Sequence, residues 1–305
     1  MRLGPTLPET PTRMSSAMSQ SQASAAVTQQ LDASTSLALT GQTLYGDDFS
    51  QAEIDTWFAD EREGYFNLYF RDAPAGAGAD AEYTYSSLAE QHGFRWLQQR
   101  RYQHALGIGS ANGAELRPVL DRSARITILE PSDGFAATTI DGKPVNYVKP
   151  QPSGLMPFDD ATFDLVVCFS VLHHIPNVST VIGEIQRVLK PGGHVLLREP
   201  THSMGDWRQP RRGLTKNERG IPIEVFRSIL LRSGLRVLRE TRCIFSLTSR
   251  LEPLIGRPVW TVPVIVRADA WLCSLPLWSK KYHADTLWQR FRPTSVAYVL
   301  EKPAA

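Results

Sequence analysis

Short apolar runs alternate along the chain with segments whose apolar residues recur at helical spacing. The run Phe163–Phe169 is almost unbroken, as expected for a strand that a parallel sheet buries on both faces. Strands that alternate with helices in this way predict an α/β fold. Seven segments have strand character: the stretch from Tyr102 into Gly107, Arg125–Glu130, Val145–Val148, Phe163–Phe169, His194–Arg198, a segment that starts at Leu235, and Ser295–Glu301.

The helices between these strands have start and stop signals. Asn177 or Ser179 can cap a helix whose apolar side chains share one face. Pro191 and the two glycines after it end that helix and start the next strand. A further helix begins near Pro222, and Gly234 ends it.

Two more helices are predicted before the first strand. Ser50 and Glu53 form a capping-box pair, in which the serine accepts from the backbone of Glu53 and the glutamate reaches back. Helix should run from there to about Arg62, and a second helix from about Ser86 to Arg101. Between them, four aromatic residues follow at helical spacing: Tyr65, Phe66, Tyr69 and Phe70.

Composition limits the class of protein. The 305 residues are 42% hydrophobic, enough for one sizeable core with a tail and an added element. A net charge of +2 argues against a dedicated nucleic-acid binder, so no nucleic-acid partner is expected. The three cysteines (Cys168, Cys243 and Cys273) form neither a disulfide framework nor a metal-ligand spacing, so we expect no metal.

The chain divides into five expected parts. Residues 1–43 are polar and should be a disordered tail, in which Met14 and Met18 are alternative translation starts. No signal peptide and no run of 18 apolar residues is visible, so we expect a cytoplasmic protein. The other four parts are a helical cover (44–101), a ligand-binding core (102–242), a helical insertion or lid (243–294) and a closing strand (295–305).

A glycine turn follows the first predicted strand. Gly107 can take the backbone angles of a tight turn, and Gly109 has no Cβ to keep a ligand away from the backbone. The second strand ends in Glu130, near the distance at which nucleotide-binding βαβ units place the carboxylate that holds a ribose. One carboxylate can accept hydrogen bonds from both ribose hydroxyls, so a ligand that carries a ribose is expected here.

Two later segments extend the pattern: the run from Leu155 to Ile175, which ends in Leu-His-His-Ile, and Val188–Leu197 with its Lys-Pro-Gly-Gly turn. Together with the glycine turn and Glu130, they closely resemble the class I S-adenosylmethionine-dependent methyltransferases over about residues 95–240. The resemblance implies a doubly wound, seven-stranded, mostly parallel Rossmann-like sheet whose last strand is antiparallel. In that family N-terminal helices often cover the active site, so the resemblance implies such a cover here.

The resemblance further implies a set of contacts with S-adenosylmethionine. The glycines would lie beside its methionine part and Glu130 would hold its ribose. The full expected set is Gly107, Ile108, Gly109, Ser110, Glu130, Pro131, Ser153, Phe169 and Ser170. The chain departs from the family at Ala105, Ala111 and Pro152, where an acid, a glycine and an adenine-binding aspartate are usual.

The expected reaction is transfer of a methyl group to a small molecule or glycan. O-methylation needs a base, and the candidates are His173, His174 and His202, although such a histidine often only packs or holds a loop. Arg208, Arg211 and Arg212 form either a solvated loop or a clamp for an anionic sugar or a surface-polysaccharide intermediate. The predicted acceptor rests on this clamp and on a loose similarity of the segment Ser203–Trp207 to methyltransferases that act on such substrates.

Two alternative functions remain: an NAD-dependent oxidoreductase, and a non-catalytic partner subunit that binds the cofactor. The insertion, which contains four tryptophans, could extend the core, cover the acceptor as a lid, or rest on the inner face of a membrane as a peripheral contact. We expect the lid. The sequence predicts no particular oligomeric state.

Overall fold

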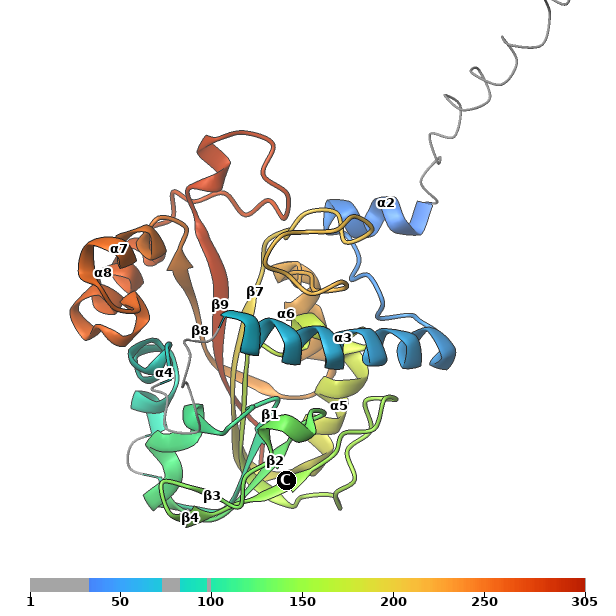
Figure 1. Ribbon diagram of the computed structural model, residues 1–305, viewed down its shortest axis with the longest axis vertical. Coiled ribbons are helices and arrows are strands. Elements are labelled where there is room, and N and C mark those ends of the chain that lie inside the picture. Colours follow the sequence, from blue (N-terminus) through green and yellow to red (C-terminus); the bar gives the residue numbers. More distant parts are fainter. Residues whose placement is uncertain (1–32, 73–82, 98–99, 305) are drawn as a thin grey trace, which may run out of the picture.

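The strands lie in one sheet of seven, in the order β5-β2-β1-β6-β7-β9-β8 (Figure 1). The computed structural model describes residues 33–72, 83–97 and 100–304. β9 is antiparallel to both of its neighbours, and the other paired strands are parallel. The predicted fold is therefore confirmed. The strands are β1 (Tyr102–Ile108), β2 (Ser123–Leu129), β5 (Asn146–Val148), β6 (Phe163–Phe169), β7 (Leu189–Pro200), β8 (Arg236–Phe245) and β9 (Pro293–Glu301).

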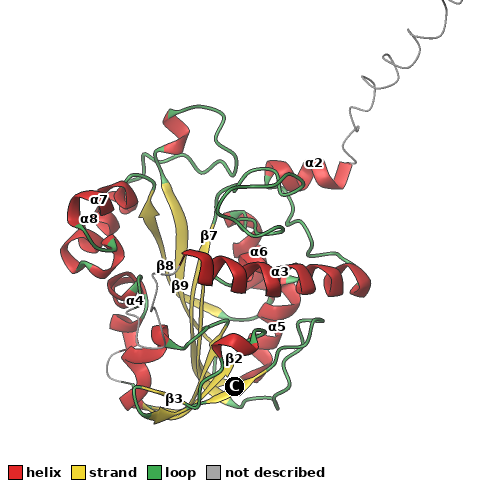
Figure 2. Cartoon of the chain, in the orientation of Figure 1, coloured by secondary structure: helices red, strands yellow, loops and turns green. Residues whose placement is uncertain are grey.

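Helices cover both faces of this sheet (Figure 2). Along β6, Val166 and Cys168 face the cluster that contains α5 (Val178–Val188) and α6 (Ile223–Arg232). Leu165 alternates with them and packs toward the opposite face. Full burial on both sides explains why the strand is apolar at almost every position.

The other face carries shorter and less regular helices. The helix predicted for 86–101 breaks at Gly93 into α4 (Ser86–His92) and the 3-10 turn η1 (Phe94–Leu97); residues 98–99 lie outside the described part. After the glycine turn the chain forms a 3-10 helix, η2 (Ala114–Arg122), instead of an α-helix. Pro118 lies inside it and has no N–H for an α-helical hydrogen bond. A short hairpin, β3 (Thr139–Ile140) and β4 (Lys143–Pro144), follows β2.

The N-terminal segment contains two helices, α2 (Ala33–Thr40) and α3 (Gln51–Asp72). The expectation of a disordered tail to residue 43 is therefore wrong from Ala33 onward; residues 1–32 lie outside the described part. α3 continues past the predicted end at Arg62, so the aromatic segment belongs to the same helix. The side chains of Phe66, Tyr69 and Phe70 lie outside the described part.

Two predicted helix caps differ in detail. Glu53 does reach back to the N–H of Ser50 (2.8 Å), but the Ser50 hydroxyl donates to the same carboxylate instead of accepting from the backbone. At α5, neither Asn177 nor Ser179 provides the cap. The carboxylate of Asp47 accepts from both the N–H and the hydroxyl of Ser179 (2.7 and 2.5 Å), so the N-terminal segment caps a helix of the core.

The insertion, predicted to be helical, folds into short helices beside β8. They are η5 (Thr248–Leu251), α7 (Glu252–Ile255), η6 (Val259–Thr261), α8 (Pro263–Ser274) and η7 (Trp288–Arg290). Trp260 and Val266 are buried in a cluster with Leu88 and Cys243, which ties the insertion to α4 and β8. None of the described helices is long and apolar enough to cross a membrane.

Candidate cofactor and acceptor site

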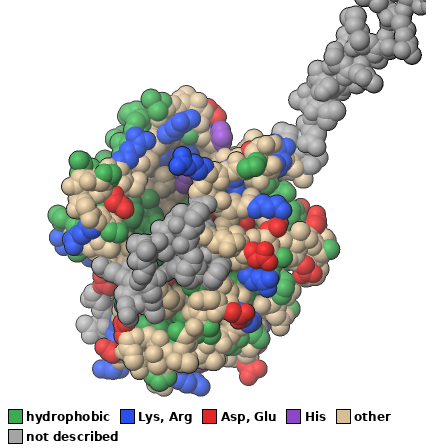
Figure 3. Space-filling model, in the orientation of Figure 1, with side chains coloured by type: hydrophobic (Ala, Val, Ile, Leu, Met, Phe, Trp, Pro, Cys, Tyr) green, Lys and Arg blue, Asp and Glu red, His purple; other side chains and the backbone are tan. Residues whose placement is uncertain are grey.

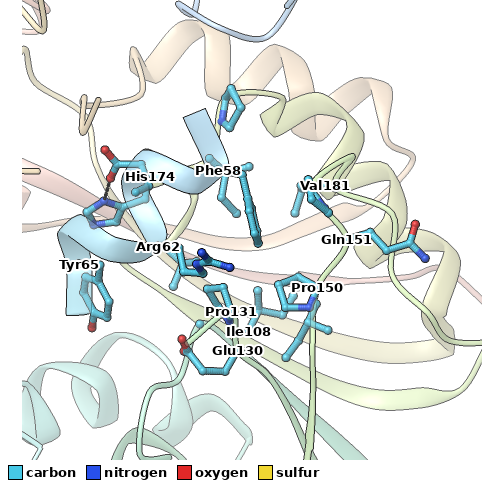
Figure 4. Close-up of a pocket in the computed structure, with 18 of the residues that line it drawn as sticks. Phe58, Arg62, Tyr65, Ile108, Glu130, Pro131, Pro150, Gln151, His174 and Val181 are labelled. Carbon is cyan, nitrogen blue, oxygen red and sulfur yellow. Dashed lines mark hydrogen bonds and ion pairs between the residues drawn. The ribbon is translucent and has the colours of Figure 1, made fainter. Parts of the chain in front are cut away.

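A pocket opens beyond the carboxyl ends of β1, β2 and β6, beneath α3 (Figure 4). Chain order reverses at β1, which is where doubly wound sheets bind ligands. The pocket holds about 920 Å³ including its open mouth, and most of its wall is apolar. It is lined by Phe58, Glu61, Arg62, Tyr65, Ile108, Gly109, Leu129, Glu130, Pro131, Pro150, Gln151, Pro152, Gly154, Met156, Ser170, Val171, His174, Ile175, Pro176 and Val181.

Glu130 lines this pocket and is the buried acid that the sequence predicted. Its side chain is 2% exposed, and its carboxylate accepts from the backbone N–H groups of Ala111 (3.1 Å) and Ser132 (3.0 Å). Burial raises the pKa of Glu130, although the two N–H bonds act in the opposite direction. Each oxygen keeps a second lone pair, so the fixed carboxylate fits the hydroxyls of a ribose.

The glycine turn is built differently from the prediction. Gly107 lies inside β1 and has no positive φ, so it does not supply the angles of the turn. A Cβ there would collide with the Ser110 side chain. Gly109 has a φ of +60°, and a Cβ on it would lie 2.7 Å from Cγ1 of Val171. Gly109 is therefore required by its own backbone and by a neighbouring side chain, before any ligand is considered.

Some of the other expected cofactor contacts line the pocket and some do not. Those that line it, together with Gly109 and Glu130, are Ile108, Pro131 and Ser170.

Ser110, Ser153 and Phe169 do not line the pocket. The Ser110 hydroxyl donates to the buried Glu115 (2.6 Å), and Phe169 packs edge-on against Phe94 in the core. The carbonyl of Ser153 accepts from Asn177, while its two chain neighbours line the pocket instead. These three residues therefore contact other protein groups and do not face the pocket.

Several pocket residues were missed by the sequence analysis. Phe58, Arg62 and Tyr65 reach the pocket from α3 (Figure 4), so this helix is its roof. The aromatic residues at helical spacing were a signal for it. Met156 and Gln151 come from the segment where the adenine contact was sought, and the Gln151 amide points away from the cavity.

His173 holds the loop after β6 together. Its side chain is buried, with Nδ1 2.8 Å from Glu199 and Nε2 3.6 Å from Glu218. Burial disfavours the charged ring, but the hydrogen bonds and charges of these two carboxylates outweigh burial and raise the pKa of His173 to about 9. A ring that is already protonated at neutral pH cannot act as a base, so His173 has a structural role.

His174 is the histidine that lines the pocket. Its Nδ1 lies 2.8 Å from the carboxylate of Glu61 on α3. Glu61 is itself fixed, because it also accepts from the Thr215 hydroxyl (2.5 Å) and from the N–H of Asn217 (2.7 Å). The indole of Trp57 donates to the carbonyl of His174 (2.7 Å), so α3 is attached to this loop at two points.

A third ligand-type group lies near the two rings. His173, His174 and Glu218 bring three atoms that could bind a metal within 4.8 Å of one another. The proton on His173, its hydrogen bond to Glu199 and its ion pair with Glu218 account for this arrangement without an ion.

His202 lies outside this pocket. Its Nδ1 donates to the carbonyl of Thr294 (3.0 Å), and its ring lines a second, smaller pocket. Burial lowers the pKa of His202, so the ring is neutral. It is not placed to act on a ligand beneath α3.

The basic loop does not form the predicted clamp. Arg208 is paired with Asp206, two residues away (2.6 Å). Arg211 donates to backbone carbonyls of its own loop, including those of Thr215 and Lys216. Arg212 is exposed, and none of the three predicted arginines lines the pocket.

A fourth arginine of this loop, Arg219, is 1% exposed. It donates to the carbonyls of Tyr45, His173 and Pro176. Like Arg211, it joins chain segments together and does not face a ligand.

The insertion also differs from its expected place. No described residue of 243–294 lines the pocket, and the roof is α3. The predicted cover of the active site is therefore formed by the N-terminal helix, and the lid expectation for the insertion is not supported.

Comparisons with known proteins agree with this geometry. Residues 106–197 match the family described as "Methyltransferase domain". The sterol 4-C-methyltransferase strm-1 of Caenorhabditis elegans is 33% identical over 31% of this chain and 30% of its own length. The ubiquinone biosynthesis O-methyltransferase of Dechloromonas aromatica is 32% identical over 31% of this chain and 43% of its own. This chain thus matches less than half of the length of either relative.

A solved structure shares the fold. The N-methyltransferase NodS of Bradyrhizobium japonicum, in complex with S-adenosyl-L-homocysteine, superposes with a TM-score of 0.50 at 15% identity. The match covers 80% of this chain and 99% of NodS. Residues 106–197, which run from β1 into β7 and fold in this strand order, are thus similar to a methyltransferase domain, and S-adenosylmethionine is the cofactor that this match indicates.

Proposed function

We propose that the chain methylates a hydroxyl group of an apolar small molecule, with His174 as the base. The pair formed by His174 and Glu61 carries the proposal. When neutral, His174 donates from Nδ1 to Glu61, which leaves Nε2 of this pocket-lining residue free to accept a proton. Because Glu61 is held by Thr215 and Asn217, the tautomer and the orientation of the ring are both fixed.

The pocket residues also account for the cofactor. Glu130 would hold the ribose, Gly109 would allow close approach of the backbone, and the apolar wall would receive the adenine. Bound S-adenosylmethionine supplies an electrophilic methyl group. α3 covers the pocket from above, which would limit the access of water and help to align the two reactants.

The apolar wall supports an apolar acceptor. Two relatives are named for a sterol and for ubiquinone biosynthesis, and a third, from Mycobacterium ulcerans, is a phthiotriol/phenolphthiotriol dimycocerosates methyltransferase. The anionic-sugar acceptor relied on arginines that are instead bound to carbonyls and to Asp206. The proposal therefore keeps O-methylation and replaces the glycan with an apolar hydroxyl compound such as a phenol, quinol or sterol.

The test follows formation of S-adenosyl-L-homocysteine with a panel of phenols, quinols and sterols. His174→Gln should lower kcat by about 100-fold or more, the usual effect of losing a general base. Glu61→Gln should lower kcat by less, because the ring remains. His283→Gln, an exposed histidine outside the pocket, serves as the control and should match the wild type. Full activity of His174→Gln would overturn the assignment of the base.

Calorimetry separates the alternative functions. S-adenosyl-L-homocysteine should bind and NAD should not, since Glu130 alone does not make a dinucleotide site. Glu130→Gln should weaken that binding by ~1–3 kcal/mol, the range for a hydrogen bond to a charged group. Cofactor binding without turnover of any acceptor in the panel would favour the non-catalytic subunit.

A further inference from the structure

A second pocket, which we call the basic pocket, lies where β7 ends and the insertion returns to β9. Four cations surround it, and its lining includes no aspartate or glutamate among the described residues. Figure 3 shows Lys and Arg side chains gathered beside a hollow in the upper part of the molecule. The lining residues are Thr201, His202, Ile223, Arg242, Ser279, Lys280, Lys281, Arg292, Pro293 and Ser295.

Two of the four cations have protein partners that hold the pocket together. Arg292 is 5% exposed and donates to the carbonyls of Lys281 and Tyr282. Lys281 pairs with Asp285 (2.7 Å). These contacts fix the wall of the pocket.

The other two cations are available to a ligand. Arg242, half-buried on β8, and Lys280, exposed on the insertion, have no hydrogen-bonding or ion-pair partner within 33–72, 83–97 and 100–304. With hydroxyl groups such as Thr201 beside them, they form a site for an anion. An arginine fork and a lysine suit the oxygens of a phosphate.

The insertion that supplies Lys280 and Lys281 to this pocket also exposes apolar side chains, and we call this set of side chains the insertion face. Of the thirteen large hydrophobic side chains that are exposed in the described residues, seven lie between 251 and 288. Two are tryptophans, 67% and 70% exposed. The seven are Leu251, Leu254, Val264, Trp271, Leu277, Leu287 and Trp288.

This segment also carries an excess of positively charged residues. Residues 246–292 contain seven Lys and Arg against three Asp and Glu. Asp269 is buried and accepts from the backbone of Ile244 and Phe245, so it does not offset the surface charge. Exposed tryptophans beside basic residues are typical of a surface that rests at the boundary of an anionic bilayer.

We propose that the insertion face binds the surface of a membrane and that the basic pocket takes the phosphate of an anionic phospholipid headgroup. The apolar side chains enter the headgroup region while Arg242 and Lys280 contact the phosphate. A second copy of this chain fits less well, because a symmetric contact would bring two basic pockets together. The proposal goes beyond the methyl transfer proposed above and does not depend on it.

Sedimentation with vesicles tests the proposal on the full chain. The protein should sediment with vesicles of equal phosphatidylcholine and phosphatidylglycerol, and only weakly with phosphatidylcholine alone. Arg242→Gln combined with Lys280→Gln should reduce the partition coefficient by roughly five-fold for each cation removed. Added salt should reduce it in the same direction.

Matched control variants distinguish vesicle binding through this site from non-specific binding through any exposed cation or apolar side chain. Arg125→Gln removes one exposed cation at the amino end of β2, and Leu231→Ser removes one exposed leucine from α6; both should bind vesicles as the wild type does. Trp271→Ser with Trp288→Ser should lose most of the binding. Each variant should keep its affinity for S-adenosyl-L-homocysteine, which shows that it is folded.

Four results would overturn the proposal. The first is wild-type protein that stays in the supernatant with both vesicles, and the second is equal binding by the Arg242/Lys280 and Arg125 variants. The third is stabilisation by inorganic phosphate in a thermal shift assay without vesicle binding, which would assign the basic pocket to a soluble anion. Concentration-dependent self-association that the tryptophan variant abolishes, again without vesicle binding, would assign the insertion face to a second copy.

Discussion

At the scale of single residues, the surroundings of a side chain decide its role more than its type does. His173 and His174 are adjacent in sequence, yet one is buried between two carboxylates and the other lines the pocket. Arg211 and Arg219 lie in a loop rich in cations, but their guanidinium groups are bound to carbonyls. For His173, His174 and Arg219 the deciding partners are distant in sequence, whereas Arg211 binds carbonyls of its own loop.

The turn at Gly109 gives the first prediction. Gly109→Ala should destabilise the protein by ~1–2 kcal/mol for a left-handed residue with a Cβ, and by ~1–3 kcal/mol more for overpacking against Val171. Val171 is β-branched and cannot move aside, so the overpacking cost comes from its side chain. In a Val171→Ala background only the cost of the left-handed backbone should therefore remain. Urea unfolding of the four proteins measures both parts. Equal costs in the two backgrounds would show that Val171 does not restrict this position.

His173 gives a prediction about pH. Its pKa is raised from 6.5 to about 9 in the folded protein, so folding favours the protonated ring. The stability that this provides is fully present below pH 6.5 and is lost as the pH rises toward 9. The free energy of unfolding, measured from pH 6 to pH 10, should fall more steeply for the wild type than for His173→Gln. Parallel curves would mean that His173 is neutral in the folded state.

At the scale of elements, α3 connects the fold to the site. It forms the roof of the pocket, and it is docked through Trp57 to His174, through Glu61 to Thr215 and His174, and through Asp60 to Lys216. The helix that shields the pocket therefore also orients the proposed base. Displacement of α3 would open the pocket and release the His174 ring at the same time.

The insertion gives a prediction at this scale, because its tryptophans are not equivalent. Trp260 is 5% exposed in a cluster with Leu88 and Cys243, so Trp260→Ala should cost about 3–5 kcal/mol of stability. Trp271 is 67% exposed, and Trp271→Ala should change stability by no more than about 0.5 kcal/mol. Chemical denaturation of both variants measures the contrast. A large cost at Trp271 would mean that this face is packed in the folded chain.

At the scale of the whole molecule, the sheet is completed by the last segment of the chain. β9 lies between β7 and β8 and pairs with both, so it joins the parallel part of the sheet to its edge strand and to the insertion. Val296, Tyr298 and Leu300 are buried in the main core, and Ala297 is buried in the cluster that holds the insertion. Every part of the sheet beyond β7 therefore depends on this strand.

Truncation tests this dependence. A chain that ends at Arg292 lacks β9 and should show no cooperative thermal unfolding, because β8 and the insertion lose their attachment. A chain that ends at Lys302 keeps the hydrogen bond from Lys302 N–H to the Gly193 carbonyl (3.0 Å) and should melt like the full chain. Circular dichroism during heating distinguishes the two. A cooperative transition in the shorter chain would contradict the central role of β9.

The sequence by itself determined the sheet, the acid at the end of its second strand and the resemblance to a methyltransferase domain. Strands such as Phe163–Phe169 are recognisable because burial on both faces leaves no polar positions, and Glu130 because it ends such a strand. These patterns are local, so neighbouring residues suffice to reveal them.

Only the tertiary structure decided which side chains face the ligand. Glu61 and His174 are 113 positions apart and meet because α3 folds back over the sheet edge. Arg219 and Tyr45 are 174 positions apart, and the hydrogen bond between them joins two distant segments through a buried cation. Burial and the pairing of charges depend on which distant segments pack together, and the local pattern of residues does not carry that information.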